Sequence, residues 1–76
     1  MREKILEALR NVADDADFEA SEDLLEDGLI DSFQMVKLVS ELEDAFSIDI
    51  NGSDIIPDNF LNLKTIEEMV KRYTEA

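Results

Sequence analysis

The sequence contains no cysteine and no histidine, and these two absences exclude much of the chemistry that small proteins perform. Without cysteine there is neither a disulfide framework nor a thiolate ligand for a metal. Without histidine, a serine hydroxyl lacks the base that most often activates it as a nucleophile. A G-x-S-x-G elbow and a Gly-rich phosphate loop are also missing. We therefore expect no catalytic residue and no metal site, and a protein on which other enzymes act.

Long apolar runs are missing as well, since no more than two apolar residues follow one another anywhere in the chain. A transmembrane helix needs about 20 predominantly apolar residues, so no membrane span is expected. Arg2, Glu3 and Lys4 follow Met1 directly, without the apolar segment of a signal peptide. We expect a cytoplasmic protein, and the 76 residues predict one small monomeric domain over residues 1–76.

Basic residues are scarce, and the net charge is −13. Lys37 is the only basic residue between Asn11 and Leu63, a stretch that holds most of the 20 acidic residues. Nucleic acid and anionic membrane surfaces are polyanions that such a chain repels. Protein surfaces of positive potential are the natural complement, because opposite potentials raise the encounter rate. The sequence therefore predicts protein partners with basic surfaces.

Hydrophobic periodicity predicts an all-α fold, because no alternating apolar run of strand length is present. Apolar residues instead recur at helical spacing, and Thr65-Ile66-Glu67-Glu68 has the form of a capping box that begins the last helix. The predicted fold is a small four-helix bundle of three main helices and one short one. The expected elements are helices over residues 3–13, 32–46 and 65–73, and a short helical turn over residues 53–60 that Pro57 interrupts.

A long polar loop over residues 14–23 follows the first helix. We expect Phe18, Leu24 and Leu25 to attach it to the core, since they are the large apolar residues in or just after it. Gly28 is expected to form a turn before the second helix.

The second helix has the clearest start signal in the chain. Asp31 as the N-cap places Gln34 at the third helical position, which gives a D-x-x-Q capping box. Ile30 and Met35 then occupy the two positions of a hydrophobic staple. Ser32 becomes the first helical residue, beside unpaired backbone N–H groups at the positive end of the helix. An anionic phosphodiester on its hydroxyl is favoured there.

Two apolar residues of the second helix fall outside its core stripe. At about 100° per residue the stripe consists of Met35, Leu38, Val39, Leu42, Ala45 and Phe46. Phe33 and Val36 lie on the side of Ser32 instead. This indicates a face for partner docking, although Phe33 could also fold back under a neighbouring loop. The candidate docking residues are Phe33, Val36, Lys37, Ser40, Glu43 and Asp44.

Three segments carry a resemblance to a known family: Gly28-Leu29-Ile30-Asp31-Ser32-Phe33 with Val36, Leu38, Val39, Leu42, Glu43 and Phe46, then Ile55-Ile56-Pro57-Asp58-Asn59-Phe60, and Thr65-Ile66-Glu67. Together they resemble the acyl carrier proteins, whose hallmark is an Asp-Ser-Leu tripeptide opening the second of four helices. The resemblance covers essentially the whole chain.

The resemblance implies that Ser32 receives a 4′-phosphopantetheine arm from coenzyme A, attached by a separate phosphopantetheinyl transferase. Asp31 is the capping neighbour of that serine. The thiol of the arm holds acyl or aminoacyl groups as thioesters, which loading and transferring enzymes supply and remove. Glu43 and Asp44 match acidic positions that dock on partner enzymes.

Four departures bear on the cargo. Phe33 replaces the usual Leu of fatty-acid carriers, and Gly28 lies four residues before the serine instead of three. Gln34 and Lys37 stand where those carriers usually have acids. The segment Glu-Asp-Gly-Leu-Ile-Asp-Ser-Phe is closer to D-alanyl carrier proteins and other specialised carriers. The resemblance therefore predicts a thioester carrier and leaves the choice between fatty-acid biosynthesis and an aminoacyl pathway open.

Two other classes of protein are considered. Asp15, Asp17, Glu19 and Glu26 fall at positions 1, 3, 5 and 12 of an EF-hand calcium loop, but Ala20 occupies position 6, which requires Gly. A weaker form of this hypothesis is non-specific binding of divalent cations by the acidic loops. The second class is an acidic adaptor that binds a basic partner without any prosthetic group.

Overall fold

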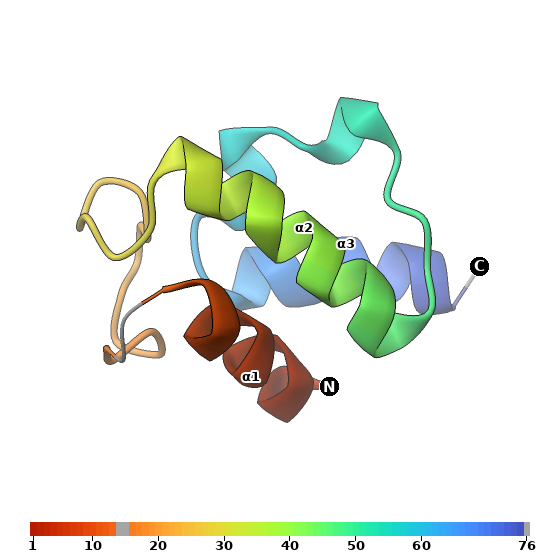
Figure 1. Ribbon diagram of the computed structural model, residues 1–76, viewed down its shortest axis with the longest axis horizontal. Helices are drawn as coiled ribbons and strands as arrows, with labels where there is room; N and C mark the ends of the chain where they lie inside the picture. Colours follow the sequence, from red (N-terminus) through yellow and green to blue (C-terminus); the bar gives the residue numbers. More distant parts are fainter. Residues whose placement is uncertain (14–15, 76) are drawn as a thin grey trace.

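The computed structural model describes residues 1–13 and 16–75, and the regular structure of these residues is entirely helical. In Figure 1, α2 crosses in front of α3 and α1 lies below them. The all-α bundle expected from the sequence is confirmed. Among the described residues, no helix is both long enough and apolar enough to cross a membrane. The elements are α1 (Arg2–Val12), α2 (Ser32–Phe46), η1 (Gly52–Asp54), η2 (Pro57–Phe60) and α3 (Leu63–Thr74).

Three helices and their connecting loops contribute to one hydrophobic core, as the predicted stripes require. Each buried aliphatic or aromatic side chain contributes about 1.5–3 kcal/mol relative to exposure. No polar or charged side chain is buried in the part of the chain that the structure describes. The buried residues are Ile5, Leu6, Ala8 and Leu9 of α1, Met35, Leu38, Val39 and Leu42 of α2, Leu63, Ile66, Met69 and Val70 of α3, and Phe18, Leu24, Ile30, Ile50 and Phe60 outside these helices.

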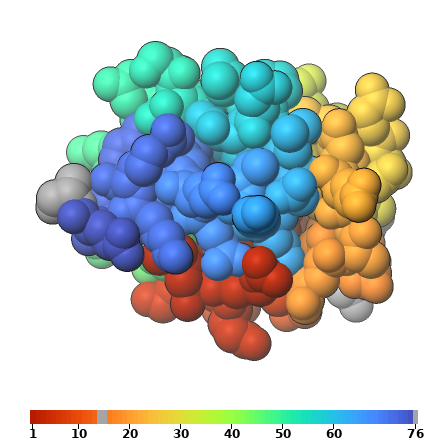
Figure 2. Space-filling model, turned by 180° about the vertical axis from the view of Figure 1, so that it is seen from behind, coloured from red at the N-terminus to blue at the C-terminus, as the bar shows by residue number. Residues whose placement is uncertain are grey.

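The loop between α1 and α2 is attached to the core as predicted. Phe18 and Leu24 are buried and Leu25 is partly buried. The backbone N–H of Leu24 donates to the carbonyl of Leu61 at 2.6 Å, which links the loop to the segment before α3. Gly28 has a φ of +73°, a conformation that favours glycine, so its predicted role as a turn residue is confirmed. In Figure 2 this loop, in orange and yellow, lies beside the first part of α3.

The predicted start of the last helix at Thr65 is wrong. Helix α3 begins at Leu63, and its N-cap is Asn62, whose side-chain oxygen accepts from the Thr65 N–H at 3.0 Å. Thr65 is the third helical residue, and its hydroxyl oxygen accepts from the Asn62 N–H at 3.2 Å. Two interactions outside the helix favour this register. Leu63 is buried, and the Asn62 side-chain amide donates to the Glu22 carbonyl at 3.1 Å.

The connection between α2 and α3 contains the predicted short helical segment in two pieces. Pro57 occupies the first position of η2, where its missing N–H costs nothing and its fixed φ suits the turn. Pro57 therefore begins the second 3₁₀ turn, while the first ends at Asp54 with Ile55 as its C-cap. Helix α2 ends at Phe46, and its C-cap is Ser47, a non-glycine residue with a left-handed φ of 55°.

Candidate functional site

The start of α2 is held by the predicted capping box. The Asp31 Oδ1 accepts from the Gln34 N–H at 2.7 Å, and the Gln34 Oε1 accepts from the Asp31 N–H at 2.9 Å. The flanking Ile30 and Met35 are both buried in the core, as the staple positions require. Local sequence therefore fixes where this helix begins, and Ser32 is its first residue.

The side chain of Ser32 is available to an external enzyme. Ser32 is exposed, and its hydroxyl makes no hydrogen bond with the described residues. The backbone N–H groups of the first helical turn have no partner within the helix, and they lie at the positive end of the helix dipole. Both features favour an anionic group at this position. These surroundings fit a covalently attached phosphodiester on the Ser32 oxygen.

Phe33 and Val36 leave large apolar surfaces in water next to Ser32. The Phe33 side chain is 68% exposed and Val36 is 58% exposed. The alternative in which Phe33 folds under a loop is therefore wrong. The Lys37 ammonium lies 4.8 Å from the centre of the Phe33 ring, a cation–π contact, and Ser40 is exposed one turn further. We call Phe33, Val36, Lys37 and Ser40 the α2 face.

The two predicted acidic docking residues differ from each other. The Glu43 carboxylate is half-buried and accepts from the Ile50 N–H at 2.9 Å, so it closes the turn after α2. The Asp44 carboxylate is exposed. By helical spacing Glu43 follows Val36 and Ser40, and Asp44 follows Lys37 and Ser40. Both acids continue the α2 face toward its far end, but only Asp44 is fully open to a partner.

A family model described as a phosphopantetheine attachment site matches residues 2–73. The chain belongs to this family. Its members are carrier domains rather than catalysts, and they bear covalently attached 4′-phosphopantetheine. Searches of curated proteins and of solved structures give no match to the chain.

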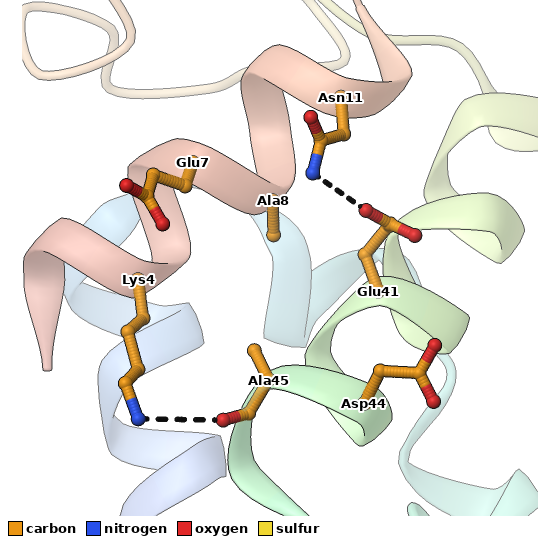
Figure 3. A pocket seen from close by; sticks show the side chains of 7 residues that line it. All are labelled: Lys4, Glu7, Ala8, Asn11, Glu41, Asp44 and Ala45. Atoms are coloured by element: carbon orange, nitrogen blue, oxygen red, sulfur yellow. Dashed lines mark hydrogen bonds between the residues drawn. The ribbon is translucent and has the colours of Figure 1, made fainter.

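This carrier domain has an open polar groove between α1 and α2, which the sequence did not predict. In Figure 3 the Lys4 ammonium donates to the Ala45 carbonyl at 3.4 Å, and the Asn11 amide donates to Glu41 at 2.7 Å. Asp44 also borders the groove, which has a volume of about 270 Å³. Ser32 and Phe33 are not among its lining residues. The groove lies where α1 and α2 meet, and the hydrogen bonds from Lys4 and Asn11 join the two helices at its ends.

A second polar cluster in the carrier domain joins the connection after α2 to the end of α3. The Tyr73 hydroxyl donates to the Asp54 carboxylate and accepts from the Asn51 N–H at 2.9 Å. Arg72 approaches Asp54 at 3.8 Å. The hydrogen bond to Asp54 raises the pKa of Tyr73 above its ordinary value, and burial raises it further. The helical pattern of the sequence carries no information on these contacts of the Tyr73 hydroxyl.

The acidic loop gives no support to a calcium site. Among the described residues, no group of three or more acidic side chains could hold a metal ion. Asp17 and Glu19 are exposed, and the Asp17 carboxylate accepts from the Ala20 N–H at 3.3 Å. Asp15, the first position of the considered EF-hand loop, lies outside the described residues.

Proposed function

We propose that this carrier domain bears its 4′-phosphopantetheine on the Ser32 oxygen and delivers acyl or aminoacyl groups to partner enzymes. The observation that carries the proposal is the position of Ser32. It is an exposed serine at the first position of a capped helix, with two exposed apolar side chains beside it. When bound, the arm supplies a terminal thiol that holds the cargo as a thioester.

The attachment step places simple demands on the chain. The Ser32 oxygen forms a bond to the phosphorus that carries the pantetheine group in coenzyme A, and the pyrophosphate bond of coenzyme A breaks. The adenosine bisphosphate portion leaves, and the hydroxyl proton passes to a base. We assign that base to the transferase, since this chain has no histidine and the Asp31 carboxylate next to Ser32 is engaged in capping the helix. The chain contributes an accessible hydroxyl and a helix start that favours the anionic product.

The other serines have surroundings that suit attachment less well. The Ser21 hydroxyl donates to Asp27 at 2.6 Å, and the Ser53 hydroxyl donates to the Asn51 side chain at 3.0 Å. Ser47 is the left-handed residue that ends α2, and Ser40 lies in the middle of that helix. Only the Ser32 hydroxyl combines a helix start with exposed apolar neighbours.

The α2 face and the acids beyond it support the proposed docking role. Phe33 and Val36 offer apolar contact, while Asp44 offers charge to a basic surface. Partners of this kind are the phosphopantetheinyl transferase and the enzymes that load and unload the cargo. The cytoplasmic location, the monomeric state and the single domain over residues 1–76 remain predictions from the sequence.

An aminoacyl cargo, D-alanyl among them, is the second candidate. Its support is the pair of departures at Phe33 and Gln34. Phe33 presents an aromatic ring to partners where fatty-acid carriers usually present Leu. Gln34 uses its amide N–H₂ as a donor, which an acid at this position cannot do. The adaptor without a prosthetic group loses its support, because the matched family is defined by phosphopantetheine attachment.

Intact-mass measurement after incubation with coenzyme A and a broad-specificity phosphopantetheinyl transferase tests the proposal. The wild type and the controls Ser21→Ala and Ser53→Ala should each gain one phosphopantetheine mass. Ser32→Ala should gain none, while its circular dichroism spectrum stays unchanged because Asp31 still caps the helix. A Ser32→Ala protein that is modified like the wild type would refute the proposal.

A further inference from the structure

The side chain of Gln34 connects two helices at the point where the proposed attachment site begins. Its Oε1 accepts from the Asp31 N–H at 2.9 Å, as the capping box requires. Its Nε2 donates to the carbonyl oxygen of Val12, the last residue of α1, at 3.1 Å. This second hydrogen bond is partly buried and is not part of any capping box. One amide group therefore joins the start of α2 to the end of α1.

The side-chain hydrogen bonds between α1 and α2 in the described residues include three that are spread along α2. Gln34 bonds to Val12 in the first turn of α2, Asn11 bonds to Glu41 in the middle, and Lys4 bonds to Ala45 near the end. Only the first of them touches the turn that contains Ser32. The Val12 carbonyl is among the last four of α1, which have no partner within their own helix.

An amide is the group that this position requires. It needs an acceptor on one side for the Asp31 N–H and a donor on the other for the Val12 carbonyl. Glutamate supplies two acceptors and no donor when ionised, so one of its oxygens would face the Val12 oxygen. Helix rules alone give the opposite expectation, because glutamate is favoured at the third position of a capping box and near the positive end of a helix.

We propose that Gln34 is a positioning residue for the loading of Ser32, and that it acts by anchoring the first turn of α2 to the end of α1. The inference rests on the proposed function of Ser32. Helix ends open with little free energy, so the first turn exchanges between formed and frayed states. Only the formed turn presents Ser32 and Phe33 together. Loss of the anchor lowers the formed fraction, and the apparent affinity for the transferase falls in proportion while the chemical step is unchanged.

The test compares Gln34→Glu and Gln34→Ala with wild type and with Asn11→Ala, which removes the neighbouring link between the same two helices. The measurements are KM and kcat for phosphopantetheine transfer and the hydrogen-exchange rate of the Met35 amide. That amide donates to the Asp31 carbonyl at 2.9 Å and so reports on the first turn. Both Gln34 variants should accelerate Met35 exchange roughly 2- to 10-fold, the effect of one net hydrogen bond on the ratio of frayed to formed turn. KM should rise by a smaller factor, because it follows the formed fraction, and kcat should stay within about 2-fold of wild type. Asn11→Ala should change neither Met35 exchange nor KM.

The outcomes separate this inference from the function on which it rests. If the wild type is loaded on Ser32 and both Gln34 variants keep wild-type KM and Met35 exchange, the positioning role is refuted and the proposed function stands. A fall in kcat at unchanged KM also contradicts it. If Gln34→Glu does not fold, as shown by circular dichroism, Gln34→Ala decides, because it removes the bond to Val12, together with the capping acceptor, without adding a charge. Modification that persists in Ser32→Ala refutes the proposed function and this inference together.

Discussion

The start of α2 and the second 3₁₀ turn each carry a phenylalanine, and the surroundings of the two rings are opposite. Phe60 is fully buried in the core. Phe33 is 68% exposed, and its ring makes a cation–π contact with the Lys37 ammonium at 4.8 Å. A small core has few large apolar side chains, and leaving one in water gives up the free energy of its burial. The difference indicates that Phe60 serves folding, whereas Phe33 is left for a partner.

The polar contacts around Phe60 and Phe33 differ in the same way as the burial of the two rings. The connection that contains Phe60 is tied down by Asn59, whose amide donates to the Asp54 carbonyl at 2.8 Å, and by the Tyr73 hydroxyl. At the start of α2 the hydrogen bonds of Asp31 and Gln34 hold the backbone and leave the side chains of the α2 face uncovered. The molecule thus presents exposed side chains on a hydrogen-bonded backbone at the start of α2 and a closed surface around Phe60.

The stability difference between the two phenylalanines should be the largest effect. Phe60→Ala removes a fully buried ring and should cost about 3–5 kcal/mol of unfolding free energy. Phe33→Ala should change it by no more than about 0.5 kcal/mol, because the ring is already in water. Urea unfolding followed by circular dichroism measures both. Equal losses in the two variants would show that Phe33 belongs to the core and that the comparison is wrong.

Phe33→Ala, which should change stability little, should have a clear effect on partner binding. Phe33→Ala should weaken the complex with the phosphopantetheinyl transferase by roughly 1–3 kcal/mol, if the partner fully buries the ring. The loss should be similar at low and high salt, because apolar burial does not depend on charge screening. Titration of the folded variant at two salt concentrations measures it. Unchanged affinity at both concentrations would remove Phe33 from the docking surface.

The polar contacts of the connection between α2 and α3 can be tested by removing the Tyr73 hydroxyl. Tyr73→Phe removes the hydroxyl that bridges Asp54 and Asn51 and should cost about 0.5–1.5 kcal/mol of unfolding free energy. Because the pKa of Tyr73 is raised above 10.0 in the folded protein, the wild type should keep this contribution below pH 10 and lose it as the pH rises further. Urea unfolding from pH 8 to 11 should show the two proteins converging at the high end. A constant difference across this range would contradict the role of the hydroxyl.

Charge reversal beyond the α2 face should have the smallest effect. Asp44→Lys should slow transfer to Ser32 roughly 2- to 5-fold at low salt and flatten its salt dependence, because steering acts on the encounter rate. Glu43→Lys should also lower the melting temperature, since it loses the bond to the Ile50 N–H. Glu68→Lys on α3 makes the same change in net charge and serves as the control. If it slows transfer as much as Asp44→Lys, the effect belongs to total charge and not to this surface.

The start of α2 could be predicted from the sequence because its signals are local. Asp31 and Gln34 are three residues apart, and the flanking apolar positions agree with them. The start of α3 could not, since Asn62 and Thr65 are both good capping residues. The choice between them depends on the burial of Leu63 and on the bond to the Glu22 carbonyl, 40 residues away in sequence.

Features of the site that join distant segments were likewise beyond sequence reasoning. Helical spacing puts Glu43 in line with Val36 and Ser40, but it carries no information on the loop amide that the Glu43 carboxylate binds. The hydrogen bond from Gln34 to Val12 joins residues 22 apart in the sequence, and no pattern in either segment predicts it. The exposure of Phe33 was favoured by the wheel and decided by the fold.

The most direct test of the central claim is to locate the arm on the loaded protein. Fragmentation mass spectrometry of the wild type after transfer from coenzyme A should place a single phosphopantetheine on Ser32, with none on Ser21, Ser40, Ser47 or Ser53. An arm on any other residue, or a second arm of equal occupancy, would contradict the assignment of the start of α2 as the attachment site.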